Sequence, residues 1–74
     1  MAIIEVYRTN VQSSMQVKQL VNALHRQFPW YTANFDLHDC DNILRIESSA
    51  MQIEDEGIIS FMKTYGFTAE PLPD

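Results

Sequence analysis

The stretch ANFDLHDCDNILRIE, residues 33–47, decides the fold because it has the pattern of a β-hairpin in the middle of the chain. Apolar side chains occupy alternate positions before the turn and again after it: Ala33, Phe35, Leu37, Leu44 and Ile46. The residues between the two runs, DCDN at 39–42, are types that favour turns. We therefore predict two paired strands with an apolar inner face. The open face would carry the remaining side chains: Asn34, Asp36, His38, Ile43, Arg45 and Glu47.

A strand and a helix are predicted on the amino-terminal side of the hairpin. IIEVYR, residues 3–8, is rich in the β-branched and aromatic residues that strands favour. We expect Ile4 and Val6 to face the core. The outward side chains of this strand would then be Ile3, Glu5 and Tyr7. A helix follows, because apolar side chains recur there at helical spacing: Val17, Leu20, Val21, Leu24 and Phe28.

Capping residues set the expected ends of two helices. Ser13 or Ser14 can cap the first helix, since a serine hydroxyl accepts a hydrogen bond from an otherwise unpaired amide. On the carboxyl-terminal side, the acidic residues 54–56 suit the positive end of a second helix that begins near Glu54. Gly66 suits the left-handed residue that follows a helix. The short run FTAEPL, residues 67–72, is predicted to be the last strand.

The predicted order of elements is βαββαβ, which is the α+β ferredoxin-like arrangement of two helices on one face of a four-stranded antiparallel sheet. At 74 residues the chain is expected to be one domain, residues 1–74, with a short tail at 71–74. In this topology the first and second strands run in the same direction. The loop 9–14, the turn 39–42 and the turn 65–67 should therefore meet at one end of the molecule, the first-loop pole.

Composition limits the partners that this chain can have. Its formal net charge is -5, with 5 lysine and arginine residues against 10 aspartate and glutamate residues. This balance argues against binding to nucleic acid or to an anionic membrane, both of which need a basic surface. One cysteine allows no internal disulfide, and no signal peptide or long apolar run is seen. A cytoplasmic location and a protein partner are expected.

Three segments carry a family resemblance: VKQLVNAL at 17–24, FDL at 35–37 and YGFTAEPL at 65–72. They are similar to the heavy-metal-associated domain family, which includes small copper chaperones and the amino-terminal modules of metal-pumping ATPases, and the similarity extends from Ile3 to Leu72. The family binds metal through a methionine and two cysteines that are separated by two residues. The resemblance puts Val11 at the methionine, and Ser13 and Gln16 at the two cysteines. A hydroxyl and an amide are poor ligands for Cu(I), so the resemblance implies the fold without the usual CxxC metal site.

The function expected from these features is that of a small non-enzymatic binding or interaction module. No nucleophile with an adjacent base is visible, which argues against catalysis, and no cofactor is expected. The surface predicted to contact a partner lies at the first-loop pole: Ser13, Met15, Cys40 and Phe67. A homodimer through the open sheet face is also possible, through an apolar strip of Ile3, Tyr7 and Ile43. At the opposite end FPWY, residues 28–31, either anchors a partner or closes the core.

The alternative function is binding or trafficking of Cu or Zn through a relocated site near Cys40. A thiolate, an imidazole and a thioether are a plausible ligand set for Cu(I) or Zn(II). The candidate ligands are Cys40, His38, Asp39, Asp41 and Met15. The competing interpretation is that DCDN only closes the hairpin and that Cys40 is incidental.

Overall fold

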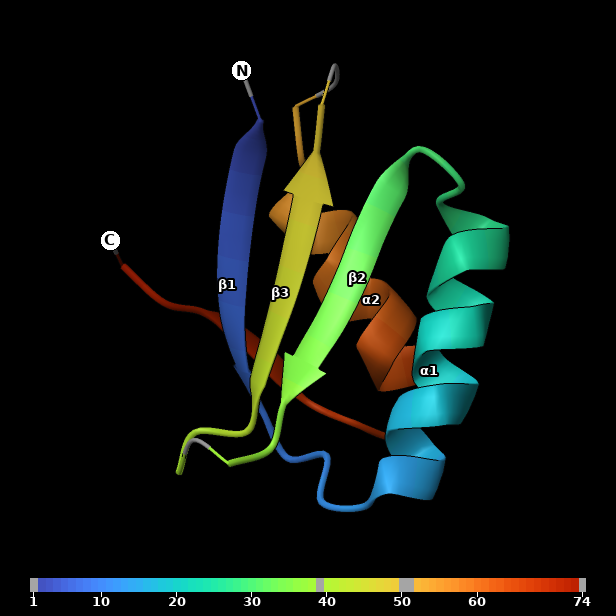
Figure 1. The fold of residues 1–74 in the computed structure, drawn as a ribbon, viewed down its shortest axis with the longest axis vertical. Coiled ribbons are helices and arrows are strands. Elements are labelled where there is room, and N and C mark those ends of the chain that lie inside the picture. The colour runs from blue at the N-terminus through green and yellow to red at the C-terminus, as the bar shows by residue number, and fades with distance from the viewer. Residues whose placement is uncertain (1, 39, 50–51, 74) are drawn as a thin grey trace.

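The computed structural model describes residues 2–38, 40–49 and 52–73. Its elements are β1 (Ile3–Thr9), α1 (Ser14–Gln27), β2 (Tyr31–Asp36), β3 (Ile43–Ser48), α2 (Asp55–Thr64) and β4 (Ala69–Pro71). Within the described residues the strands form one four-stranded sheet of order β2-β3-β1-β4, and every neighbouring pair is antiparallel. In Figure 1, α2 passes behind the strands and α1 stands beside β2. The ferredoxin-like α+β prediction is confirmed.

The predicted capping residues stand at the ends of the two helices. Ser13 is the N-cap of α1, and Glu54 is the N-cap of α2. After α2 the backbone of Gly66 has a φ of 86°, in the left-handed region that glycine adopts without strain. The Gly66 amide donates to the Lys63 carbonyl and the Phe67 amide donates to the Met62 carbonyl, which together form a Schellman motif. Local sequence signals therefore predict the starts of both helices and the end of α2 correctly.

The hairpin has the predicted faces, and it is slightly longer than expected at its start. β2 begins at Tyr31, and its partner β3 runs to Ser48. Phe35 pairs with Leu44, so these two side chains lie on the inner face together. Asn42, the last residue of the DCDN turn, has a φ of 50°, which asparagine tolerates better than most residues. Asp39 lies outside the described residues.

The facing of β1 differs from the prediction. Tyr7 is fully buried and pairs with Leu44, whereas Ile4 is 47% exposed and pairs with Glu47 on the open face. The alternation of IIEVYR does not choose between its faces, because each face carries at least two large apolar side chains. Tyr7 faces inward because its hydroxyl donates to Asp55 Oδ1 at 2.7 Å, which satisfies the polar end of a buried ring.

The expected apolar strip of Ile3, Tyr7 and Ile43 is therefore wrong. Ile43 pairs with Arg8 and lies on the open face, opposite to the face that carries Tyr7. Arg8 also forms an ion pair with Glu70 of β4 at 3.5 Å. The open face around this pair is consequently of mixed polarity, and dimerisation through it would need a different set of contacts.

The core lies between the sheet and the two helices. Its buried apolar residues come from every element and from both long loops: Tyr7, Val11, Leu20, Ala23, Leu24, Tyr31, Ala33, Leu44, Ile46, Ile53, Ile58, Phe61, Met62 and Ala69. Phe67 and Phe28 are half-buried and pack against this cluster. In the described part of the chain, neither helix has the length and apolar character needed to cross a membrane.

One edge of the sheet is covered by a helix side chain. β2 is an edge strand, and the backbone amide of Ala33 points away from β3 and donates to Nε2 of His25 in α1 at 3.3 Å. An exposed edge amide is a template for pairing with another chain, so this bond protects the edge. The opposite edge is the three-residue strand β4, which is too short to present a long template.

Candidate functional site

The first-loop pole is held together by hydrogen bonds between segments that are far apart in the chain. The buried Thr9 donates its hydroxyl to the Asn42 carbonyl at 2.6 Å and its amide to the Asp41 carbonyl at 3.2 Å. The Thr68 amide, just after the turn that follows α2, donates to Asn10 Oδ1 at 2.9 Å. The first loop, the hairpin turn and the chain after α2 therefore meet, as the topology predicts.

Ser13 and Gln16, which the resemblance puts at the cysteine positions, bond to each other's backbone. Ser13 Oγ accepts from the Gln16 amide at 3.1 Å, and Gln16 Oε1 accepts from the Ser13 amide at 3.3 Å. Gln16 Oε1 also accepts from the Gln12 amide at 3.1 Å. This arrangement is a capping box, in which two side chains satisfy otherwise unpaired amides at the start of a helix. Both side chains thus stabilise the start of α1.

The hairpin turn presents Cys40 at the same pole. Its thiol is exposed and forms no disulfide. The amide of the exposed His38 donates to Asp36 Oδ1 at 3.0 Å, a local bond typical of turns. Among the described residues, no three histidine, cysteine, aspartate or glutamate side chains are grouped so that they could hold a metal ion. Asp39, one of the candidate ligands, lies outside the described residues.

The other residues predicted to contact a partner differ in exposure. Met15 is 72% exposed in the first turn of α1, where it lines a shallow depression of about 550 Å³ together with Val17 and Val21. Phe67 is half-buried and packs against the core. Met15 and Cys40 are thus the accessible members of the predicted surface, whereas the Ser13 hydroxyl is engaged in the capping box.

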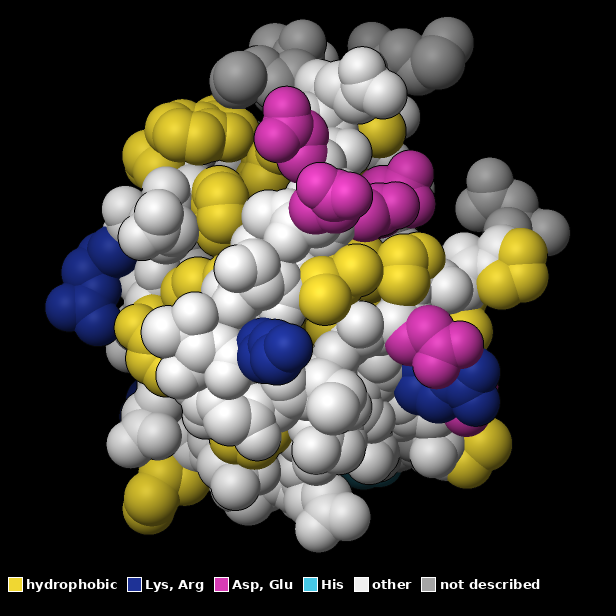
Figure 2. Space-filling view, turned by 180° about the vertical axis from the view of Figure 1, so that it is seen from behind, with side chains coloured by type: hydrophobic (Ala, Val, Ile, Leu, Met, Phe, Trp, Pro, Cys, Tyr) yellow, Lys and Arg dark blue, Asp and Glu magenta, His cyan; other side chains and the backbone are white. Residues whose placement is uncertain are grey.

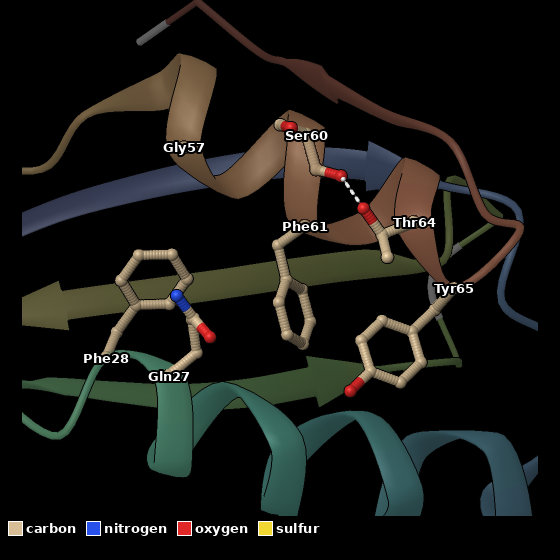
Figure 3. A pocket seen from close by; sticks show the side chains of 7 residues that line it. All are labelled: Gln27, Phe28, Gly57, Ser60, Phe61, Thr64 and Tyr65. Atoms are coloured by element: carbon tan, nitrogen blue, oxygen red, sulfur yellow. Dashed lines mark hydrogen bonds between the residues drawn. The ribbon is translucent and has the colours of Figure 1, made fainter.

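A second concave surface, the interhelical groove, lies between the end of α1 and the length of α2 (Figure 3). It has a volume of about 430 Å³ and is lined by Gln27, Phe28, Gly57, Ser60, Phe61, Thr64 and Tyr65. The rings of Phe28, Phe61 and Tyr65 lie in a row between the helices, with centroid separations of 6.0 Å and 4.8 Å along the row. The described residues that line the groove include no charged side chain.

Two features keep the interhelical groove open and apolar. Gly57 has no side chain, and a Cβ there would lie 3.8 Å from Cε1 of Phe28. The Thr64 hydroxyl donates back to the Ser60 carbonyl at 2.9 Å, so its hydrogen atom is already used within α2. Tyr65 remains 50% exposed at one end of the groove. A mainly apolar hollow of this volume lies in the range of ligand-binding pockets.

A smaller hollow of about 170 Å³ adjoins the groove and shares Phe28 and Gly57 with it. Trp30, Tyr31, Gln52 and Glu54 complete its lining. Trp30 is 50% exposed and contacts the ring of Phe28 edge-on at a centroid distance of 6.3 Å. Figure 2 shows acidic side chains gathered next to hydrophobic ones at this end of the helical face. The acidic residues at the start of α2 are Glu54, Asp55 and Glu56.

Two buried tyrosines anchor the segment that carries these acids. Tyr31 donates its hydroxyl to the Gln52 carbonyl at 3.2 Å, and the Glu54 amide donates to the same hydroxyl at 3.4 Å. Burial, together with the hydrogen bond to Asp55, raises the pKa of Tyr7 well above its ordinary value of 10.0. Tyr7 therefore stays neutral near pH 7, where it acts as a hydrogen-bond donor and not as a base. The carboxylate of Asp55 accepts the hydrogen bond of Tyr7, while the side chains of Glu54 and Glu56 are exposed.

The interhelical groove was not among the sites predicted from the sequence. Phe61 and Tyr65 have the spacing of a core-facing stripe, and only the exposure of Tyr65 distinguishes a groove wall from the core. The signal that could have indicated the groove is Gly57, a residue without a side chain in the apolar half of a predicted helix.

Comparison with known proteins gives no match: no family model, curated protein or solved structure matches this chain. What the protein can bind is therefore judged from its own side chains.

Proposed function

We propose that this protein is a small non-enzymatic interaction module of heavy-metal-associated-like fold, which binds a protein partner without using the first loop to hold metal. The observation that carries the proposal is the capping box of Ser13 and Gln16. Thiolates at these two positions would be ligands for Cu(I), whereas a hydroxyl and an amide are poor ligands that here satisfy backbone amides instead. Exposed apolar side chains on the helical face, such as Met15 and Trp30, support a role in protein contacts.

Metal competition tests the proposal that the first loop does not hold metal. The protein is titrated into a complex of Cu(I) with a chromophoric chelator, and the absorbance of the complex is followed. Wild-type protein is expected to leave the complex intact. The double variant Ser13→Cys, Gln16→Cys is the matched positive control, since it restores two thiols at the helix start and should withdraw Cu(I). Withdrawal of Cu(I) by the wild-type protein would contradict the proposal.

Binding of a partner is tested by selecting random peptides displayed on phage against the immobilised protein. Enrichment of sequences whose binding is competed by free protein supports an interaction module. A selection that enriches no competed sequence would count against it.

The alternative, Cu or Zn binding at Cys40, is favoured by one observation: an exposed thiol lies in the hairpin turn whose Asn42 carbonyl accepts a hydrogen bond from Thr9, at the end of β1. Equilibrium dialysis of wild type and Cys40→Ser against Cu(I) and Zn(II) tests it. His38, Asp39, Asp41 and Met15 are the further ligands to substitute if the wild type alone takes up metal. Equal, negligible uptake by both proteins would end this alternative.

A further inference from the structure

The interhelical groove has the shape and chemistry to accept a flat apolar side chain. Its three rings, Phe28, Phe61 and Tyr65, present faces and edges with which another aromatic ring packs favourably. Gly57 leaves room between Phe28 and α2 at the point where any other residue would project a side chain. Because no charged side chain among the described residues lines the groove, a charged group would lose its hydration there without a partner.

The rim of the groove is acidic. Glu54 lines the adjoining hollow, and as the N-cap of α2 its side chain makes no capping hydrogen bond. Glu56 is exposed in the first turn of the same helix, one helical turn before Ser60, which lines the groove. Asp55 is held by Tyr7, which leaves Glu54 and Glu56 as the carboxylates that can meet a ligand. An uncharged aromatic groove with carboxylates at its end is complementary to an aromatic side chain flanked by basic ones.

We infer that the interhelical groove docks a basic peptide segment of a partner protein, with an aromatic side chain of that segment in the groove and its lysine or arginine side chains at Glu54 and Glu56. This inference rests on the proposed function as an interaction module and names the chemistry of its partner. The exposed ring of Trp30, beside Glu54 in the adjoining hollow, gives a flanking basic side chain a π-face as well as a carboxylate.

A second copy of this chain is a poor occupant of the groove. Its five basic residues are spread along the sequence, and the closest two, Lys18 and Arg26, are eight residues apart. Arg8 is also paired with Glu70. No segment of the chain therefore combines an aromatic residue with basic residues on both sides. A partner of different sequence meets this requirement.

The test uses a fluorescein-labelled peptide with a central tryptophan, lysines on both sides and a glycine-serine remainder. Its binding to the full chain is followed by fluorescence anisotropy at low and at physiological salt. Saturable binding is expected, about tenfold weaker when the tryptophan is replaced by alanine, because a buried aromatic anchor carries much of the affinity of such contacts. A peptide with glutamates in place of the lysines should not bind.

Variants of the groove locate the binding. Gly57→Leu fills the groove without removing an existing contact and should weaken binding at least about tenfold. Gly57→Ala is the matched control, which adds only a methyl group and should keep most of the affinity. Tyr65→Ala, at a half-exposed position, is a second groove variant and should also weaken binding. Circular dichroism and the thermal midpoint establish that each variant is folded.

Variants of the acidic rim test whether Glu54 and Glu56 pair with the lysines of the peptide. Glu54→Gln with Glu56→Gln should lower the affinity and flatten its dependence on salt, since two charge pairs are lost. Glu47→Gln on the open face removes one acidic charge elsewhere and is expected to change binding little. If the peptide does not bind, or if it binds unchanged to Gly57→Leu and to the rim variant, the inference is overturned. A molecular mass that doubles with protein concentration in wild type but not in Gly57→Leu would also overturn it, in favour of a second copy.

Failure of this inference differs from failure of the proposed function. Phage-selected peptides that bind wild type and Gly57→Leu equally would overturn the groove while the interaction module stands. A phage selection without competed peptides would remove the module, and the groove proposal with it.

Discussion

The first-loop pole is closed by hydrogen bonds from side chains to backbone, whereas the interhelical groove is lined by aromatic rings that stay partly exposed. At the pole, Thr9, Asn10, Ser13 and Gln16 each bond to a backbone group of a neighbouring turn or helix start. At the groove, Tyr65 and the adjoining Trp30 are each 50% exposed. These four polar side chains of the pole are bonded within the protein, whereas the two aromatic rings at the groove keep exposed contact surface. The difference shows why a loop rich in polar residues need not be the binding site.

The largest effect is expected at the buried threonine of the pole. Thr9→Val keeps the shape of the side chain, but it leaves the Asn42 carbonyl and the Val11 amide without their partner. Loss of the partner of one buried amide and one part-buried carbonyl should lower the free energy of unfolding by about 3 kcal/mol, measured by urea denaturation. Thr68→Val is the control, because Thr68 is exposed and the substitution keeps the backbone amide that donates to Asn10. A small effect of Thr9→Val would show that the pole is not held by these bonds.

The next effect concerns the anchor of the acidic rim. Tyr7→Phe removes the hydrogen bond to Asp55 and should cost about 2 kcal/mol at pH 7. Because the folded-state pKa of Tyr7 is raised, its stabilisation is fully present below pH 10.0 and is lost as the pH rises above that value. The unfolding free energies of wild type and Tyr7→Phe should therefore converge above pH 10. A stability difference between the two proteins that stays constant above pH 10 would contradict the bond between Tyr7 and Asp55.

The capping box should contribute less than either of these bonds. Ser13→Ala removes the acceptor for the Gln16 amide and is expected to lower the unfolding free energy by about 1 kcal/mol. Ser14→Ala is the matched control, since Ser14 is the first residue of α1 and not its cap. Thermal melts of the two variants give the comparison, and equal midpoints would contradict the assignment of the cap.

The smallest effects on stability are expected at two glycines, Gly57 in the groove and Gly66 at the first-loop pole. The two effects should have opposite signs. Gly57→Ala should stabilise the protein by about 0.5–1 kcal/mol, because alanine is the better helix residue and its Cβ would meet Phe28 at an ordinary distance. Gly66→Ala should destabilise by a similar amount of about 1 kcal/mol, because its φ of 86° strains any residue with a side chain. Urea midpoints that move in the same direction would show that the backbone at one of these glycines differs.

The sequence by itself determined the elements, their order and both helix ends. The alternation at 33–37 and 43–47, the apolar stripe of α1 and the stop at Gly66 each follow from interactions within a few residues. Such local preferences act on the chain before any tertiary contact forms. The order of elements then leaves few ways to build a sheet with both helices on one face.

Only the tertiary structure decided the facing of β1 and the existence of the groove. IIEVYR has apolar residues on both faces, and the choice between them depends on Asp55, which is 48 residues away from Tyr7. The groove likewise depends on the end of α1 lying opposite Gly57 of α2. Contacts between distant segments carry no periodic signal in the sequence, since they depend on how the helices pack and not on the spacing of residues within one element.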